Sequence, residues 1–248
     1  MSELICGWHA VEAVLERDPR RIATIWLQQG RDDARAQQVR AAAQQAGLPL
    51  RTVDRRELDR MGDGTRHQGV IAEVQARPPA DMAALLDLLD GLSRPPFLLV
   101  LDQVQDPGNL GALLRSAAAA GVDAVITPSD RSAALTPAVR KTAAGAAERI
   151  LFVRVGNLAR ALDRLRERGI WVHGLAGDAD ADLYDADLTG AVALALGAEA
   201  TGLRRLTRER CDGLWKLPMA AGVESLNVSA AGAASLFEAV RQRRVARR

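Results

Sequence analysis

Five apolar runs separated by helix-like segments constrain the fold of this chain more than any other feature. The clearest run is FLLVLD at 97–102, which is typical of a strand covered on both faces. Further runs follow at 122–127, 150–155, 170–175 and 193–196. Because parallel strands need crossover connections, this alternation predicts an α/β fold with a mostly parallel sheet and helices on both faces.

The connecting segments have helix start and stop signals. Asp106-Pro107-Gly108-Asn109 is a strong turn signal, and Asn109 is expected to cap a helix over 110–120. Thr136 followed by a proline predicts a helix over 138–147. Arg115 projects away from the apolar face of the first helix. A lone arginine there is usually solvated, so spacing alone gives it no function.

Residues 1–75 show the same kind of alternation on a smaller scale. Helices are expected around 10–15 and 31–46, and strands at 22–27, 50–53 and 70–74. Paired prolines at 78–79 and 95–96 bracket a short leucine-rich helix, which is typical of a linker. The sequence therefore predicts two domains, 1–76 and 97–248, joined by a linker over 77–96.

Composition limits the class of protein. Apolar residues make up 48% and charged residues 26% of the 248 residues, as in ordinary globular proteins, and a net charge of +2 is weak evidence for a nucleic-acid partner. The sequence lacks a membrane-span run and a signal-peptide pattern, so a cytoplasmic protein is expected. Cys6 and Cys211 are far apart, no metal-ligand spacing is present, and the acidic stretch 178–182 lacks the glycine and glutamate of a calcium loop.

Two later stretches suggest a ligand site without establishing one. Gly197 and Gly202 flank Glu199 after an apolar run, which lets a backbone pass close to a ligand but also suits a plain strand-to-helix turn. A strand over 215–217 is expected to end at Pro218 and lead through a loop at 220–227 into a helix. From spacing alone, that loop is equally consistent with a ligand site and with a tightly packed terminal helix.

Three sequence phrases, taken together, indicate a function more specifically than the separate patterns do. They are DQVQDPGNLGALLRSAAAAG at 102–121, GAEATGL at 197–203 and ESLNVSAAGAASLFEAVRQRR at 224–244. In this order they resemble the three motifs of the SpoU/TrmH branch of the SPOUT methyltransferases, which methylate ribose 2′-hydroxyls of RNA with S-adenosylmethionine. The second departs from the common GEG form at Ala200 and Thr201 but keeps Glu199 and Gly202. GWHAVEAVLE and HQGVIAEV resemble the ends of the L30e-like RNA-binding domain that precedes the catalytic domain in some members.

The resemblance implies a fold and partners. The fold would be a SPOUT α/β knot over 97–248, a deep trefoil in which the C-terminal segment threads through a loop, preceded by an L30e-like domain. The protein would act as a homodimer on a guanosine in the P-loop of 23S rRNA. The S-adenosylmethionine would lie against Gly197, Leu217 and Leu226, with Met219 beside them.

The resemblance also implies site residues. The catalytic set would be Asn109, Arg115, Glu199, Ser225 and Asn227. His67 and Gln68 become candidate RNA contacts, with a structural role in a turn as the alternative reading of both, and no metal is implied.

The chemistry leaves the role of Arg115 open. A ribose hydroxyl becomes a good nucleophile only when its proton is removed or shared, and the three motifs contain neither His nor Cys. A guanidinium is essentially always protonated in proteins. Arg115 is therefore either a base after unusual desolvation or a cationic donor to phosphate and to the developing alkoxide. A tRNA methyltransferase and a non-catalytic ribosome assembly factor are the alternative functions.

Overall fold

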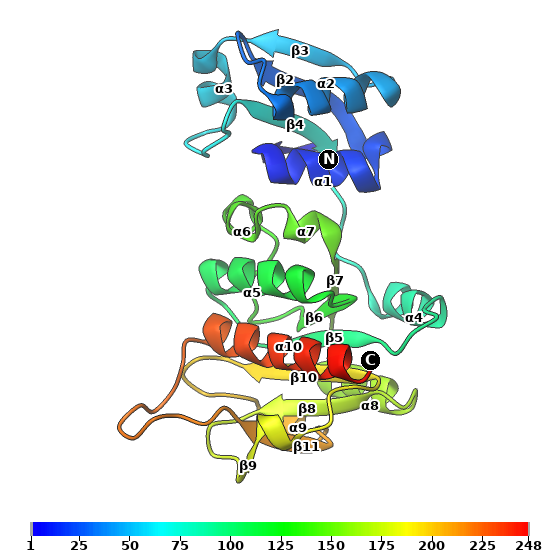
Figure 1. Cartoon of the computed structure of the whole chain (residues 1–248), viewed down its shortest axis with the longest axis vertical. Coiled ribbons are helices and arrows are strands. Elements are labelled where there is room, and N and C mark those ends of the chain that lie inside the picture. The colour runs from blue at the N-terminus through cyan, green and yellow to red at the C-terminus, as the bar shows by residue number, and fades with distance from the viewer. Residues whose placement is uncertain (1, 248) are drawn as a thin grey trace. The chain divides into compact units, whose positions relative to one another are not determined.

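A computed structural model describes residues 2–247. The chain forms two compact units. Unit 1 contains the residues up to 78 together with 135–149, and unit 2 contains 79–134 and the residues from 150 onward (Figure 1).

Unit 1 is built on a four-stranded sheet with strand order β1-β4-β2-β3. β4 is antiparallel to β1 and to β2, whereas β2 and β3 are parallel. The strands are β1 (Ser2–Cys6), β2 (Ile22–Gln28), β3 (Leu50–Val53) and β4 (Val70–Gln75). The sequence predicted β2, β3 and β4 but missed β1, whose five residues include only one buried side chain, Ile5.

Helices cover this sheet with their apolar sides. They are α1 (Trp8–Arg17), the short 3₁₀ helix η1 (Pro19–Arg21), α2 (Ala34–Gln45) and α3 (Arg55–Met61). One hydrophobic core joins β2 to helices α1 and α2. It includes Trp8, Val11 and Val14 of α1, Ile25 of β2 and Val39 of α2. The sequence missed α3, because its seven residues include only one buried side chain and give no periodic apolar signal.

The single helix predicted over 138–147 is wrong. The structure has two short helices, α6 (Pro137–Ala143) and α7 (Ala146–Arg149). Ala144 and Gly145 between them have φ values of 49° and 85°, in the left-handed region that ends an α-helix. The predicted N-cap is confirmed, because the Thr136 hydroxyl accepts a hydrogen bond from the Val139 N–H.

Unit 2 contains a seven-stranded sheet with strand order β7-β6-β5-β10-β8-β11-β9, and its described pairings are all parallel. β10 lies between β5 and β8, with Gly197 opposite Asp102 at the carboxyl-terminal edge. The strands are β5 (Phe97–Asp102), β6 (Ala124–Pro128), β7 (Leu151–Val155), β8 (Trp171–Leu175), β9 (Ala181–Asp182), β10 (Val192–Gly197) and β11 (Gly213–Lys216).

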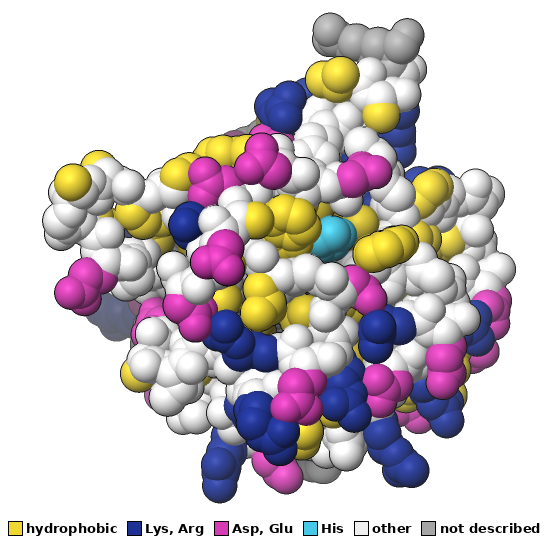
Figure 2. Space-filling model, turned by 90° about the horizontal axis from the view of Figure 1, so that it is seen from below, with side chains coloured by type: hydrophobic (Ala, Val, Ile, Leu, Met, Phe, Trp, Pro, Cys, Tyr) yellow, Lys and Arg dark blue, Asp and Glu magenta, His cyan; other side chains and the backbone are white. Residues whose placement is uncertain are grey.

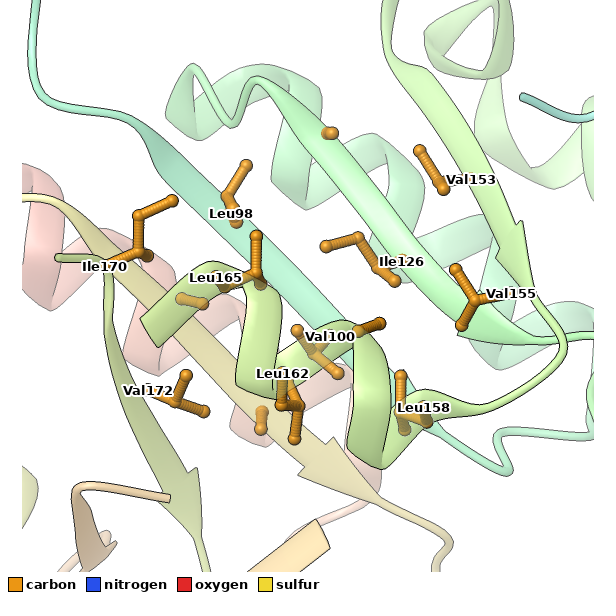
Figure 3. Close-up of a cluster of buried hydrophobic side chains, with 14 of the residues drawn as sticks. Leu98, Val100, Ile126, Val153, Val155, Leu158, Leu162, Leu165, Ile170 and Val172 are labelled. Carbon is orange, nitrogen blue, oxygen red and sulfur yellow. The ribbon is translucent and has the colours of Figure 1, made fainter. Parts of the chain in front are cut away.

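Helices cover both faces of this sheet, as predicted. On one face, α8 (Leu158–Arg166) points Leu158, Leu162 and Leu165 at the sheet (Figure 3). α4 (Met82–Asp90) contributes Leu85 to the same core, so this short helix belongs to unit 2. The remaining short elements are η2 (Leu183–Asp185) and α9 (Arg205–Arg208).

On the other face, α5 (Pro107–Ala120) and α10 (Val228–Val245) lie side by side (Figure 1). Gly232 permits this packing, because a Cβ there would lie 2.3 Å from the Leu113 side chain and 3.2 Å from that of Leu196. The C-terminal helix therefore returns onto the helix that follows β5. This return and the strand order agree with the mostly parallel α/β sheet that the sequence predicts.

Within residues 2–247, no helix is long and apolar enough to cross a membrane. The same residues contain no cluster of His, Cys, Asp or Glu side chains suited to a metal ion.

Candidate functional site

Loops that follow three neighbouring parallel strands form one pocket at the carboxyl-terminal edge of the unit 2 sheet. They follow β8, β10 and β11, and the residues leading into α10 complete the wall. Ligands of open parallel sheets bind at such an edge. All four predicted cofactor residues line this pocket: Gly197, Leu217, Met219 and Leu226.

The sequence missed other parts of this wall. Leu175, Ala176 and Gly177 line the pocket from the end of β8, and Trp215 and Lys216 line it from β11. The signal for the first group was a glycine two residues after an apolar run. Without the strand order, nothing in the sequence showed that this turn lies next to the loop after β10.

Glu199 occupies the tip of a tight loop after β10. The Ala198 N–H donates to the Gly202 carbonyl at 3.1 Å and the Gly202 N–H donates back to the Ala198 carbonyl at 2.8 Å. Gly197 is required at the base of this loop, because a Cβ there would lie 1.9 Å from the carbonyl carbon of Gly202. The loop therefore presents the Glu199 carboxylate at the pocket rim.

Asn109, Glu199 and Asn227 form one hydrogen-bonded cluster. Asn109 Nδ2 donates to Glu199 Oε1 at 2.5 Å, and Asn227 Nδ2 donates to the same oxygen at 2.9 Å. Asn227 Nδ2 also donates to Asn109 Oδ1 at 3.1 Å. The cluster therefore joins three residues, one from each of the three motif-like phrases.

The predicted helix cap at Asn109 is wrong. α5 begins at Pro107, and Asp106 is its cap, with Oδ1 accepting from the Asn109 N–H at 2.7 Å. Asp106 takes this role because it directly precedes the proline that occupies the first helical position. The Asn109 side chain is therefore free to reach Glu199.

Asn227 does cap a helix, and this role fixes its orientation. Its Oδ1 accepts from the Ser229 N–H at 2.9 Å and from the Ser229 hydroxyl at 2.6 Å. The amide nitrogen must then face Glu199, which requires a donor. Ser225 lines the pocket nearby and is exposed.

Arg115 is separate from this cluster in the single chain. It lies on α5 six residues after Asn109, which places it about 120° around the helix. Its side chain is exposed, hydrogen-bonds no other residue in the described range 2–247, and does not line the pocket. The structure therefore joins Asn109 and Asn227 to Glu199, places Ser225 in the same pocket lining as Glu199, and leaves Arg115 on a different face.

A buried carboxylate behind the pocket stabilises the Glu199 loop. Asp102 is fully buried at the end of β5 and accepts from the Arg204 backbone N–H at 3.0 Å and from Arg204 Nε at 2.6 Å. Arg204 comes two residues after Gly202, so this pair ties the end of the loop to the central strand. Sequence reasoning missed Asp102, because nothing marked a partner 102 residues away.

The pocket suits a ligand with both apolar and charged parts. Leu175, Leu196 and Leu217 supply apolar contacts, and Glu199 and Glu224 place carboxylates at the rim, where a cationic sulfonium would be favoured. Its volume of about 180 Å³ is below the 300–1,000 Å³ common for ligand pockets. The exposed residues Glu224, Ser225 and Leu226 form the wall on the side of α10, where the pocket is open to solvent.

Comparisons with known proteins agree with this geometry. Residues 96–237 match the SpoU rRNA Methylase family, and residues 4–80 match the family described as RNA 2′-O ribose methyltransferase substrate binding. The chain is 52% identical to the 23S rRNA (guanosine-2′-O-)-methyltransferase RlmB of Pseudomonas putida, with all of both chains covered. It is 51% identical to the enzyme of the same name from Escherichia coli, over 98% of this chain and 100% of that one.

Solved structures show the same fold. The SpoU methyltransferase AviRb from Streptomyces viridochromogenes, in complex with the cofactor AdoMet, has a TM-score of 0.80 at 24% identity, covering 98% of this chain and 91% of that chain. A structure described as an RNA 2′-O ribose methyltransferase has a TM-score of 0.76 at 28% identity, and the match covers 98% of this chain and 89% of that chain.

Proposed function

Because the chain belongs to the SpoU rRNA methylase family, we propose that it methylates the ribose 2′-hydroxyl of a guanosine in 23S rRNA. The chain is an S-adenosylmethionine-dependent RNA methyltransferase. The observation that carries the proposal is the Asn109–Glu199–Asn227 cluster at the rim of the pocket. A target in the P-loop of 23S rRNA is the finer part of the proposal.

The pocket residues bind and orient the reactants. Gly197, Leu217, Met219 and Leu226 would hold the cofactor, which supplies an electrophilic methyl group when bound. They come from the loops after β10 and β11, which lie on either side of β8 in the sheet, and from the entry to α10. Transfer requires the ribose oxygen to lie behind that methyl group, so the position of the rim residues controls the rate.

Glu199 is the residue best placed to orient the ribose. Both amide donors of the cluster go to its Oε1, and within residues 2–247 nothing donates to Oε2. The free oxygen can accept a hydrogen bond from the 2′-hydroxyl without any rearrangement. Asn109 and Asn227 are positioning residues for Glu199, and exposed Ser225 adds a hydroxyl at the same rim.

Arg115 keeps the two roles that its chemistry allows, base or cationic donor. Its exposed position on α5 means that it acts on groups brought to that face. Bound RNA or a second protomer would bring them there. A homodimer is part of the proposal, and Phe237, which is 50% exposed on α10, offers apolar surface for it.

The two units would divide the labour. The site residues around the cofactor pocket lie in unit 2, and residues 4–80 match a substrate-binding family. We therefore assign RNA recruitment to the domain of residues 1–76 and catalysis to the domain of residues 97–248. A 23S rRNA substrate places the proposed reaction in the cytoplasm.

Methyl transfer with isotope-labelled S-adenosylmethionine tests the proposal. Ribosomal RNA and tRNA from cells lacking this protein are incubated with the purified chain, and the labelled ribose is mapped. We expect label at one guanosine of 23S rRNA. Label in tRNA alone would support the tRNA enzyme, and binding to rRNA without transfer would support the assembly factor.

A further inference from the structure

Unit 1 contains an arginine-lined pocket that is separate from the cofactor pocket. Its volume is about 630 Å³. It lies between the start of α1, the segment leading into α2, the start of α3 and the loop at 62–69. The residues that matter for its chemistry are Arg31, Arg35, Arg55, Arg66, Gln68 and Trp8.

The loop at 62–69 is fixed by buried hydrogen bonds. The Gly69 N–H donates to His67 Nδ1 at 3.0 Å, so His67 Nε2 bears the proton and donates to Asp59 at 2.9 Å. Both ring nitrogens of this buried histidine are therefore occupied. Of the two candidate RNA contacts, His67 orders the loop, and only Gln68 offers an exposed side chain.

The backbone carbonyl of Gln68 also holds the loop at 62–69 in place. Its carbonyl oxygen accepts from Trp8 Nε1 at 3.1 Å and from Arg31 Nη1 at 3.0 Å. Gln68 has a φ of 55°, a conformation that these bonds compensate. The guanidinium of Arg31 lies 5.3 Å from the centre of the Trp8 ring, and its side chain remains 36% exposed. The pocket thus exists before any ligand arrives.

The pocket concentrates positive charge that the rest of the domain balances. Four arginines and one acid, Asp59, line it, and Asp33 beside the pocket pairs with Arg31 Nε at 2.6 Å. Asp59 already interacts with His67 and lies 3.8 Å from Arg55. The side chains of Arg35 and Arg66 are exposed and have no hydrogen-bond or ion-pair partner in the described residues. On the face of the molecule that Figure 2 shows, seen from below the view of Figure 1, basic and acidic side chains are interspersed.

We propose that this pocket binds an unpaired nucleotide of the RNA substrate. The inference rests on the proposed function, which supplies RNA as the ligand. Arg35 and Arg66 contact the phosphodiester, the exposed face of the Arg31 guanidinium stacks on the base, and the Gln68 amide bonds its edge. A volume of about 630 Å³ suits a single nucleotide and is too small for a duplex. Unpaired bases that can be stacked and read on their edges are what RNA-binding domains recognise by sequence.

The test compares two double variants of the full chain. Arg35→Ala/Arg66→Ala removes the two unpartnered guanidinium groups, and Arg20→Ala/Arg51→Ala removes two exposed arginines of unit 1 outside the pocket. We expect the pocket variant to raise the KM for unmethylated 23S rRNA at least tenfold, with kcat within threefold and cofactor affinity unchanged. The control should match the wild type.

Direct RNA binding gives a second measurement that does not depend on catalysis. Fluorescence anisotropy with a labelled fragment of 23S rRNA should show that the salt dependence of log K falls by roughly 1.4 in the pocket variant, about 0.7 for each lost phosphate contact. A single-stranded RNA should compete better than a duplex of equal length. Equal loss in the control variant, an unchanged salt slope or equal competition by duplex would overturn the proposal.

Cross-linking of the wild-type chain separates this inference from the proposed function. RNA bearing 4-thiouridine should cross-link to the loop at 62–69. Cross-links confined to unit 2 would refute the pocket assignment even if 23S rRNA is methylated. If the wild type methylates only tRNA, the rRNA assignment fails, and cross-linking with tRNA still decides whether the pocket takes an unpaired nucleotide.

Discussion

Asn109 Nδ2 lies 2.5 Å from Glu199 Oε1, although the two residues are 90 positions apart in the chain. The bond joins the first turn of α5 to the loop after β10, and Asn227 at the start of α10 donates to the same oxygen. Three segments that begin or end at the sheet edge are therefore held around one carboxylate. The geometry leaves the second oxygen of Glu199 available to substrate.

Glu199→Gln tests the role of that carboxylate. The amide keeps the size of the side chain, and its oxygen can still accept from Asn109 and Asn227, but an NH2 donor then replaces the Oε2 that would accept from the 2′-hydroxyl. We expect kcat to fall about 10²–10³-fold. Methyl transfer at saturating RNA measures it. Glu209→Gln, at an exposed residue paired with Arg205, is the matched control and should leave kcat unchanged. A Glu199→Gln enzyme within tenfold of wild type would contradict the assignment.

Replacement of Arg115 separates its two candidate roles. Arg115→Ala should abolish methyl transfer and leave cofactor affinity nearly intact, because Arg115 does not line the cofactor pocket. If Arg115 acts as a base, Arg115→Lys should retain activity that rises with pH, since a lysine deprotonates more readily when desolvated. If Arg115 binds phosphate through its planar fork, activity should stay low at every pH. Arg160→Ala on α8 is the control. Near-normal turnover by Arg115→Ala would show that another residue has this role.

Gly197→Ala should impair cofactor binding. The added methyl would lie 1.9 Å from the Gly202 backbone, so the loop that presents Glu199 must shift. Overpacking of this kind costs about 1–3 kcal/mol in the free energy of unfolding. We expect calorimetry to show at least tenfold weaker binding of S-adenosylmethionine. Gly156→Ala, where no atom lies within 4 Å of the new methyl, should bind normally. Equal affinities would mean that the loop relaxes without consequence.

Cys211 should make the stability of the chain fall in strongly basic solution. Burial, with a contribution from the neighbouring Asp212 carboxylate, raises the pKa of this thiol from 9.0 to about 12. The folded state then binds the proton more tightly than the unfolded state between these values. The stabilisation is fully present below pH 9 and is lost as the pH rises toward 12.

Denaturant unfolding at pH 8 and pH 10.5 measures this effect. The wild type should lose free energy of unfolding between the two pH values, and Cys211→Ala should lose less. Partial burial raises the pKa of Cys6 as well, so Cys6→Ala serves as a comparison at a second partly buried thiol. An identical decline in the wild type and in Cys211→Ala would mean that the thiol ionises normally in the folded chain.

Local patterns determined most of the secondary structure. The apolar runs became β5, β6, β7, β8 and β10, because a parallel strand buried on both faces needs continuous apolar sequence. Elements without such a signal were missed: β1 and β9 are short, and α3 and α9 bury one side chain each. The break between α6 and α7 was also invisible, since it depends on the left-handed backbone of Ala144.

The sequence also supplied the members of the candidate site, because three motif-like phrases occur in one order. In the structure Glu199 and Ser225 line one pocket, and Asn109 and Asn227 hydrogen-bond to Glu199. Only the tertiary structure decided how they are used. Strand order places the loops after β8, β10 and β11 together, and Asp106 rather than Asn109 caps α5, which frees Asn109 for Glu199. The burial of Asp102 against Arg204 and the gathering of arginines around Trp8 are likewise long-range relationships. They follow from packing between segments that are distant in the chain, and local sequence propensity does not specify such packing.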